Sequence, residues 1–390
     1  MRIKGDQQTA RALNRRLVLN FLRRSGPMSR AELASRSGLS GATIGFVVGE
    51  LMAEGLVCEG ESVPSNGGRR PVPVELVRGS RFAIGFKLTA QGLEGVLTDL
   101  GLEPITRVFE PIPDTRPETV VAHAACSAAA MMVGRPMKQL IGIGLALPGS
   151  YDVERGLCTL LSRFGWRDVP VADMLAEKVA VPVWVDNDVN AFALAQYLFG
   201  HGQQHDNLMT LAIGAGIGAA FMSQGRMHRG VNGAAGEIGH SIVVPGGRLC
   251  ECGRRGCLQT YFSEAALTAD WQALTAVTTG LPADLAAAAL AEVPQALSML
   301  RTAGEGLATH IAQVINVIDP DMIIVGGEGV RFGPALSDPF VATLQSLSYK
   351  SRPEVIFARD DVGWTRGAAA LAVERFFNFE AKEGTAQAST

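Results

Sequence analysis

Four residues with zinc-binding side chains lie within eighteen positions in the middle of the chain: His240, Cys250, Cys252 and Cys257. One imidazole and three thiolates suit tetrahedral zinc, which in structural sites takes four protein ligands and leaves no position open for water. Gly253 and Gly256 allow a backbone tight enough to bring the three cysteines to one point. The alternative, three small buried residues beside an unrelated histidine, gives no reason for this cysteine–glycine spacing. The spacing therefore predicts a structural zinc site rather than a catalytic one.

A second polar group follows the apolar run 182–185, where Asp186, Asn187 and Asp188 come in succession. Asparagine supplies a donor and an acceptor, and aspartate an acceptor, a combination that can bracket sugar hydroxyls. An aspartate so placed can also act as a general base on a hydroxyl. The same residue types are common helix N-caps, so a ligand site and a cap both remain open. Glu237 lies on another polar loop with the histidine, whose second ring nitrogen would point outward if the first binds zinc.

Residues 1–78 are expected to form a separate N-terminal unit, which precedes the elements that would position these residues. Its expected elements are a helix over 9–24, a short helix ending near 36, a turn at 37–39, a helix from 41 to about 54, and strands at 56–58 and 71–76. Ser29 and Glu32 form a capping-box pattern, and Ser40 caps the third helix. This order predicts a winged helix-turn-helix, in which the helix after the turn enters the DNA major groove.

Charge and residue types indicate how that unit would bind DNA. Residues 1–74 hold eleven Lys/Arg and six Asp/Glu, a net +5, which leaves −8 for the rest of a chain of net charge −3. Such asymmetry suits a polyanion, although a solvated basic face would give the same count. A three-helix unit with a hairpin could also be a dimerisation module. The third helix has no Lys or Arg, so its base contacts would come from Ser40 and Thr43 and would discriminate weakly. The expected phosphate contacts are Arg30, Arg36 and, at the wing tip, Arg69 and Arg70. Reading two half-sites together would need a homodimer or a dimer of dimers.

From Phe82 onward, β-like and helical runs alternate. The expected strands lie at 82–86, 92–99, 106–110, 140–147, 182–185, 208–212, 219–222 and 322–325, and the expected helices at 117–133 and 189–199. This alternation indicates α/β architecture, with ligands bound at the carboxyl ends of strands. The expected division is a DNA-binding domain over 1–78, a first lobe over 79–195 completed by a helix at 364–378, a second lobe over 196–363, and a flexible tail over 379–390.

The composition fits a soluble protein of a reducing compartment. At 390 residues, with 47% hydrophobic and 19% charged residues, the chain can form several units with sizeable cores. No apolar run reaches the roughly 18 residues that span a bilayer, and the N-terminus lacks a signal-peptide core. Cys58, Cys126 and Cys158 stand apart from one another, which suits a reducing environment. We expect a cytoplasmic protein with no membrane partner.

Five motifs stand out in the chain: Gly142-Ile-Gly-Leu-Ala-Leu-Pro148-Gly149, Asn187-Asp188, Gly214-Ala-Gly-Ile-Gly218, Glu237-Ile-Gly-His240 and Cys250-Glu-Cys-Gly-Arg-Arg-Gly-Cys257. Together they resemble the ROK (repressor, open reading frame, kinase) family, in its branch of NagC/XylR-type transcriptional regulators. The resemblance covers nearly the whole chain and implies a two-lobed actin/hexokinase-like domain with a sugar in the cleft. It implies that His240, Cys250, Cys252 and Cys257 hold zinc. It also implies that Asn187, Asp188, Glu237 and His240 contact the sugar near Gly149, with Asp188 the base in kinase members.

Three departures from the family pattern bear on activity and on the ligand. Kinase members carry Asp-x-Gly-Gly-Thr on the first hairpin, where this chain has Lys87-Leu88-Thr89-Ala90-Gln91. A lysine in place of the acid removes support for a magnesium nucleotide, and phosphoryl transfer depends on positioning and charge neutralisation. Ala215 also stands where kinases usually have threonine. Gln259 replaces a glutamate that reaches the sugar in family members, so it adds a donor at that place.

We therefore expect a sugar-responsive DNA-binding regulator, a repressor of carbohydrate-utilisation genes with a sugar cleft and no working ATP site. Its expected partners are a double-stranded DNA operator and a small sugar effector, and its expected cofactor is structural Zn²⁺. Two alternatives remain. One is a bifunctional sugar kinase with a DNA-binding head, favoured by the intact Asn187-Asp188 pair. The other is a regulator controlled by a protein partner, whose cleft is vestigial.

Overall fold

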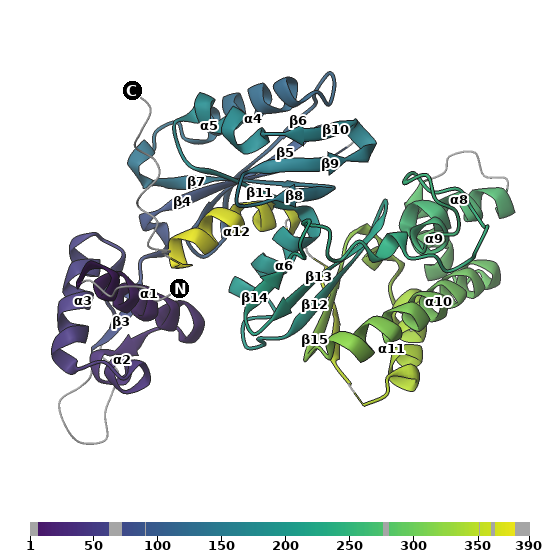
Figure 1. Ribbon diagram of the computed structural model, residues 1–390. Coiled ribbons are helices and arrows are strands. Elements are labelled where there is room, and N and C mark those ends of the chain that lie inside the picture. The colour runs from purple at the N-terminus through teal and green to yellow at the C-terminus, as the bar shows by residue number, and fades with distance from the viewer. Residues whose placement is uncertain are drawn as a thin grey trace.

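A computed structural model describes residues 7–61, 72–89, 91–275, 281–350, 352–359 and 363–378 (Figure 1). The expected phosphate contacts Arg69 and Arg70 and the expected tail 379–390 lie outside these residues, as does Ala90 of the hairpin. The described chain forms an N-terminal head followed by two α/β lobes, each built on a five-stranded sheet. The expectation of a mixed α/β protein with an N-terminal winged helix is confirmed.

The head is a helix-turn-helix with a small sheet. Its elements are α1 (Gln7–Ser25), β1 (Met28–Ser29), α2 (Arg30–Ser37), α3 (Gly41–Ala53), β2 (Val57–Glu59) and β3 (Pro73–Leu76). Ser29 and Glu32 make both bonds of the expected capping box, and Ser40 Oγ accepts from the backbone N–H of Thr43 to begin α3. Strands β2 and β3 pair as expected, and the two residues of β1, too short to foresee, join the other edge of β3.

The first lobe is built on a five-stranded sheet with the order β11-β7-β4-β5-β6. Its elements are β4 (Phe82–Leu88), β5 (Leu93–Asp99), β6 (Pro104–Glu110), α4 (Pro117–Met131), β7 (Leu140–Leu147), α5 (Val171–Val179) and β11 (Val183–Asn187). Strands β4, β7 and β11 run parallel, whereas β5 and β6 complete an antiparallel meander. A separate sheet of β8 (Ser150–Asp152), β9 (Leu157–Leu161) and β10 (Trp166–Val169) lies within a stretch for which no strands were expected.

The second lobe repeats the plan of the first, with the sheet order β14-β13-β12-β15-β16. Its strands are β12 (Leu208–Ile213), β13 (Ile217–Ser223), β14 (Arg226–His228), β15 (Met322–Gly326) and β16 (Glu354–Phe357). Its helices are α7 (Gln259–Phe262), α8 (Glu264–Thr275), α9 (Pro282–Leu290), α10 (Pro294–Ile318) and α11 (Pro334–Leu347). In each lobe an antiparallel meander of three strands continues into two parallel strands, so the two sheets have equivalent carboxyl edges.

Two helices, α6 (Asp188–Phe199) and α12 (Gly363–Asn378), run between the lobes and the head (Figure 1). Helix α12 packs on β4 and β7 of the first lobe although it comes last in the chain. The approach is so close that a Cβ atom on Gly144 of β7 would collide with the carbonyl oxygen of Ala368. Residues 368–372 of α12 are Ala-Ala-Ala-Leu-Ala and all are buried. Small side chains therefore allow α12 to lie directly on the sheet.

The core of the head is continuous with these two helices. Val18, Leu19 and Leu22 of α1 belong to the same buried cluster as Leu198 of α6 and Phe377 of α12. The two lobes have further clusters of their own, one around α4 and α5 and the other around α10 and α11. The head is thus joined to the lobes by shared apolar packing as well as by the chain. None of the described helices is both long and apolar enough to cross a membrane.

Candidate functional site

A large cleft lies between the two lobes, at the carboxyl ends of the central strands. Its volume is about 2120 Å³, and its walls come from both sheets and from the loop that precedes α7. Six residues singled out from the sequence line this one cleft: Gly149, Asn187, Asp188, Glu237, His240 and Gln259. The fold brings them together from segments up to about 110 positions apart in the chain.

Asn187 is the N-cap of α6, as one of the two interpretations of its sequence predicted. Its Oδ1 accepts from the backbone N–H of Val189 at 2.8 Å, and its Nδ2 donates to the carbonyl oxygen of Gly149 at 2.9 Å. One amide hydrogen remains for a ligand in the cleft. The preceding Asp186 is buried and accepts from Asn190 and Arg229, so it fixes the junction of β11 and α6 rather than facing a ligand.

Asp188 begins α6 with its carboxyl group in the wall of the cleft. Burial raises the pKa of Asp188, an effect that nearby Lys87 opposes. Lys87 Nζ lies 4.5 Å from the ring centroid of Trp364, which stacks on Phe192 of α6 with 4.8 Å between ring centroids. The cleft floor therefore holds a carboxyl, an ammonium and two stacked aromatic rings.

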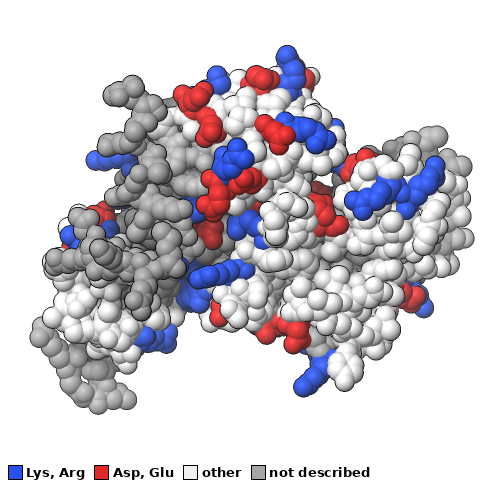
Figure 2. Space-filling view, in the orientation of Figure 1, with Lys and Arg blue, Asp and Glu red and all other residues white. Residues whose placement is uncertain are grey.

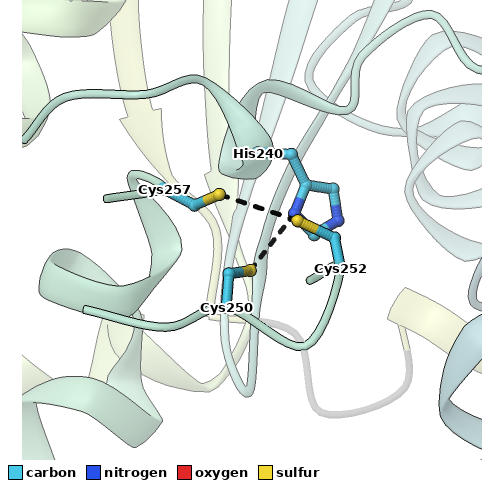
Figure 3. Close-up of side chains that lie close together, drawn as sticks. All are labelled: His240, Cys250, Cys252 and Cys257. Atoms are coloured by element: carbon cyan, nitrogen blue, oxygen red, sulfur yellow. Dashed lines mark hydrogen bonds between the residues drawn. The ribbon is translucent and has the colours of Figure 1, made fainter. Parts of the chain in front are cut away.

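A His/Cys₃ group that can hold a metal ion stands beside the cleft (Figure 3). One ligand atom from each of His240, Cys250, Cys252 and Cys257 lies within 4.8 Å of all the others. His240 Nδ1 is 3.5 Å from Cys250 Sγ, and Cys252 Sγ is 3.7 Å from Cys257 Sγ. Gly253 and Gly256 both have φ of +83°, the left-handed conformation that the tight turn was expected to require. The four ligands predicted from the sequence are therefore brought together.

His240 also connects this group to the cleft. Its Nδ1 faces the cysteines, whereas its Nε2 lies 3.8 Å from Glu237 Oε2. Burial raises the pKa of Glu237, and the neighbouring His240 opposes that rise. Gln259 lies on the other side, where its Nε2 donates to Glu251 Oε1 at 3.2 Å and is 3.6 Å from Cys250 Sγ. This His/Cys₃ group, the metal-type group, thus positions two polar side chains of the cleft, Glu237 and Gln259.

The expected DNA contacts of the head are largely paired within it. Arg30 forms an ion pair with Glu59 at 2.8 Å, and Arg36 donates to Ser25 Oγ at 2.9 Å. The hydroxyls of Ser40 and Thr43 lie 2.9 Å apart and bond to each other. Away from the head, basic and acidic side chains are interspersed over the face of the lobes drawn in Figure 2.

Family models match both parts of the chain. The model described as "ROK family" matches residues 90–375, and "Winged helix-turn-helix DNA-binding" matches residues 11–57. The chain belongs to the ROK family. The resemblance drawn from its zinc-type and glycine-rich motifs is thereby confirmed.

The chain is similar to transcriptional regulators along most of its length. The xylose repressor of Bacillus subtilis (strain 168) is 28% identical over 347 residues, which cover 88% of this chain and 90% of that protein. The transcriptional dual regulator NagC of Escherichia coli (strain K12) is 29% identical over 337 residues, 83% and 82% of the two chains. The crystal structure of a ROK family transcriptional regulator, a homologue of E. coli Mlc, superposes with a TM-score of 0.82 at 27% identity and covers 95% of this chain and 97% of its own. These similarities place this ROK protein among the transcriptional regulators rather than the enzymes of its family.

The phosphate side of the ROK cleft agrees with that placement. Lys87 and Thr89 line it where a kinase motif would supply an acid and glycines. The glycine loop between β12 and β13 is present, but the carboxyl of Glu328 lies against Gly214 so closely that a Cβ there would collide with Glu328 Oε2. A carboxylate in that position opposes the approach of a phosphate.

Two further features of the ROK protein were missed from its sequence. Phe46 of α3 is 61% exposed, although the base contacts were expected from the short side chains at the start of the helix, chiefly Ser40 and Thr43. Arg23 of α1 is buried against α6 and α12, although basic residues at the end of a helix are usually solvated. The spacing of apolar residues in α3 could have revealed Phe46, because it lies on the face opposite Ile44, Val47 and Leu51.

Proposed function

We propose that this ROK protein is a repressor of carbohydrate-utilisation genes whose binding to an operator responds to a small sugar in the interlobe cleft. The proposal rests on the relatives being repressors and on a cleft rich in hydroxyl-binding groups. Asp188, Glu237 and Gln259 offer carboxyl and amide groups from both lobes, so a bound sugar would favour one arrangement of the lobes over another.

The single observation that carries the sugar response is that α6 joins the cleft to the DNA-binding head. Asn187 and Asp188 stand at its first turn, in the cleft wall. About 15 Å further along, the carbonyl oxygen of Leu198 accepts a hydrogen bond from Arg23 of α1 at 2.6 Å. A sugar that moved the start of α6 would therefore move the support of the head.

Helix α12 makes a second connection of the same kind. Its Trp364 lines the cleft, and its far end carries Phe377, whose ring centroid is 5.6 Å from the Arg23 guanidinium. Asn20 of α1 donates to the carbonyl oxygen of Phe377 at 2.9 Å. Both helices that leave the cleft therefore end on α1, which suits a two-state change that the sugar would bias.

The metal-type group would be a structural zinc site in this proposal. With Zn–S of about 2.3 Å and Zn–N of about 2.0–2.1 Å, ligand atoms of a tetrahedral site lie roughly 3.5–3.8 Å apart. The spacing of 3.5 Å between His240 Nδ1 and Cys250 Sγ and that of 3.7 Å between Cys252 Sγ and Cys257 Sγ fit this requirement, and all four ligand atoms lie within 4.8 Å of one another. The ion would brace the loop that presents Glu237, and the four ligands would leave it no catalytic position.

An assembly and a location complete the proposal. A homodimer, or a dimer of dimers, would present paired heads to two half-sites of a double-stranded operator, as helix-turn-helix proteins require for tight reading. The cytoplasm is the compartment where DNA and reduced cysteines would both be found. The described cysteines are free, which is consistent with that compartment.

The test uses the full-length protein and the DNA upstream of its own gene. Anisotropy of the labelled fragment would be measured with a panel of neutral hexoses and pentoses. At least one sugar should change the apparent Kd, and Asp188→Ala and Glu237→Ala should bind DNA normally without responding to it. If calorimetry detects no sugar binding while DNA binding is intact, the sugar proposal is wrong and control by a protein partner takes its place.

A kinase is the second candidate, because the Asn187-Asp188 pair is retained in the cleft. Sugar-dependent ATP hydrolysis that disappears in Asp188→Asn would establish it. We expect none, because Lys87 and Glu328 occupy the phosphate side with the wrong charges and contacts for a magnesium nucleotide.

A further inference from the structure

The outer face of α3, the helix that follows the turn, is apolar. Ile44, Val47, Val48 and Leu51 point into the core of the head. The exposed residues of the helix are Gly41, Ala42, Gly45, Phe46, Gly49, Met52 and Ala53. Phe46 is the largest of them, and 61% of its surface is exposed. An aromatic ring on the surface that a winged helix presents to DNA needs a reason beyond the folding of the head.

The polar side chains of α3 and its cap are occupied within the head. Ser40 Oγ accepts from the backbone N–H of Thr43, and the two hydroxyls bond to each other at 2.9 Å. Glu50 accepts from Arg11 Nε at 3.0 Å and lies 3.7 Å from Arg15. The helix contains no lysine or arginine that could bind guanine. Helix α3 therefore has few side chains that could read base edges by hydrogen bonds.

The surroundings of Phe46 hold the ring in place and leave it prominent. The guanidinium of Arg11 lies 5.6 Å from the ring centroid, and its ion pair with Glu50 orients it there. A Cβ atom on Gly45 or Gly49 would meet nothing within 4 Å, so internal packing does not require glycine at either position. Because Gly45 and Gly49 lack side chains, the ring of Phe46 projects beyond the helix surface on the side away from the core.

We propose that Phe46 determines the sequence specificity of this protein by packing its ring against thymine 5-methyl groups in the major groove. The inference rests on the proposed function, since it assumes that α3 enters the groove. The thymine methyl is the one apolar group that the base edges present there, and phenylalanine is among the side chains that contact it. Operator half-sites should accordingly carry thymine at the base steps that α3 faces, with Arg11 beside the ring near the phosphates.

The experiment starts from a pool of random DNA duplexes, from which full-length protein selects its preferred sites. Selected duplexes are then remade with deoxyuridine in place of thymidine at the conserved positions, which removes only the methyl groups. Wild type should bind the deoxyuridine duplex about fourfold more weakly for each methyl that it contacts. Phe46→Ala should bind both duplexes alike, with the affinity that wild type has for the deoxyuridine duplex.

Met52→Ala is the matched control, because Met52 is also exposed on α3 but at its C-terminal end. It should keep the full preference for thymidine. Equal binding of the two duplexes by wild type, or an undiminished preference in Phe46→Ala, would overturn the inference. A Phe46→Ala protein that loses self-association in sedimentation, while wild type ignores the methyl groups, would show that the ring is a contact between two copies instead. Failure of the pool to yield any bound duplex would count against DNA binding itself, which separates the two proposals.

Discussion

Arg23 of α1 donates from Nη1 to the carbonyl oxygen of Leu198, one residue before the end of α6, at 2.6 Å. Only 7% of the Arg23 surface is exposed, and its guanidinium lies within 6 Å of the ring centroids of Phe199 and Phe377. Burial lowers the pKa of Arg23 to about 10, with the neighbouring Arg24 contributing, so the group keeps its charge at neutral pH. A charged donor is thus held between the head and both helices that reach the cleft.

We expect Arg23→Met to bind the operator as wild type does but to lose the sugar response. The methionine keeps an apolar stem against the two rings but leaves the Leu198 carbonyl without its donor, which should cost about 1–3 kcal/mol of unfolding free energy. Operator affinity without sugar should change little, because Arg23 is buried away from the exposed face of α3. Chemical denaturation and operator anisotropy with and without the effector would measure the two effects.

Arg301→Met is the matched control, since Arg301 is exposed on α10 in the second lobe. It should leave both stability and sugar response unchanged. A normal sugar response in Arg23→Met would show that the signal reaches the head by another route.

The metal-type group was predictable from the sequence because its ligands are local, whereas the docking of the head was not. His240, Cys250 and Cys257 lie close enough in the chain for spacing and glycine turns to specify their meeting. Arg23 meets a partner 175 positions away, and nothing in an amphipathic pattern distinguishes a buried arginine at the end of a helix from a solvated one.

The role of the cleft residue Asn187 could also be predicted only in part from the sequence. Sequence reasoning placed Asn187 both as a possible ligand and as a cap, and only its bonds to Val189 and Gly149 show how much of the amide the cap uses.

The strands over 150–169 were missed because β8 and β10 are only three and four residues long, too short for an alternating pattern to stand out. Short strands of this kind are specified by their partners more than by their own residues.

Zinc binding and sugar response should be separable at neighbouring positions. We expect His240→Ala to lose both, because it removes a ligand and the imidazole that faces Glu237. Glu237→Ala should retain zinc and lose the sugar response, since its carboxyl lies on the cleft side of the imidazole. Metal content by mass spectrometry and sugar binding by calorimetry would test both variants. Loss of zinc in Glu237→Ala would contradict this division of roles.

The half-buried Asp188 should make stability depend on pH. Burial raises its pKa above the ordinary 3.8, so the folded protein holds this proton more tightly than the unfolded chain does. The free energy of unfolding should therefore fall as pH rises from about 4 through the raised pKa, and stay level above it. Asp188→Asn should make this fall smaller, leaving the part contributed by Glu237, whose pKa burial also raises, as shown by denaturation across that range, while Glu305→Gln on the exposed face of α10 should leave the fall unchanged. An unchanged pH profile in Asp188→Asn would assign the effect to another group.

The packing of α12 on the first sheet gives the largest expected loss of stability. Gly144→Ala would place a methyl group on the carbonyl oxygen of Ala368, backbone that cannot rotate aside as a side chain can. Displacing α12 should cost about 3 kcal/mol or more, because overpacking that shifts the backbone lies at the upper end of such effects. Gly41→Ala, at a helical glycine whose added Cβ would meet nothing within 4 Å, should leave thermal stability unchanged or slightly higher. If Gly144→Ala unfolds at the wild-type temperature, then α12 does not lie on β7 as described, and its connection between cleft and head would have to be abandoned.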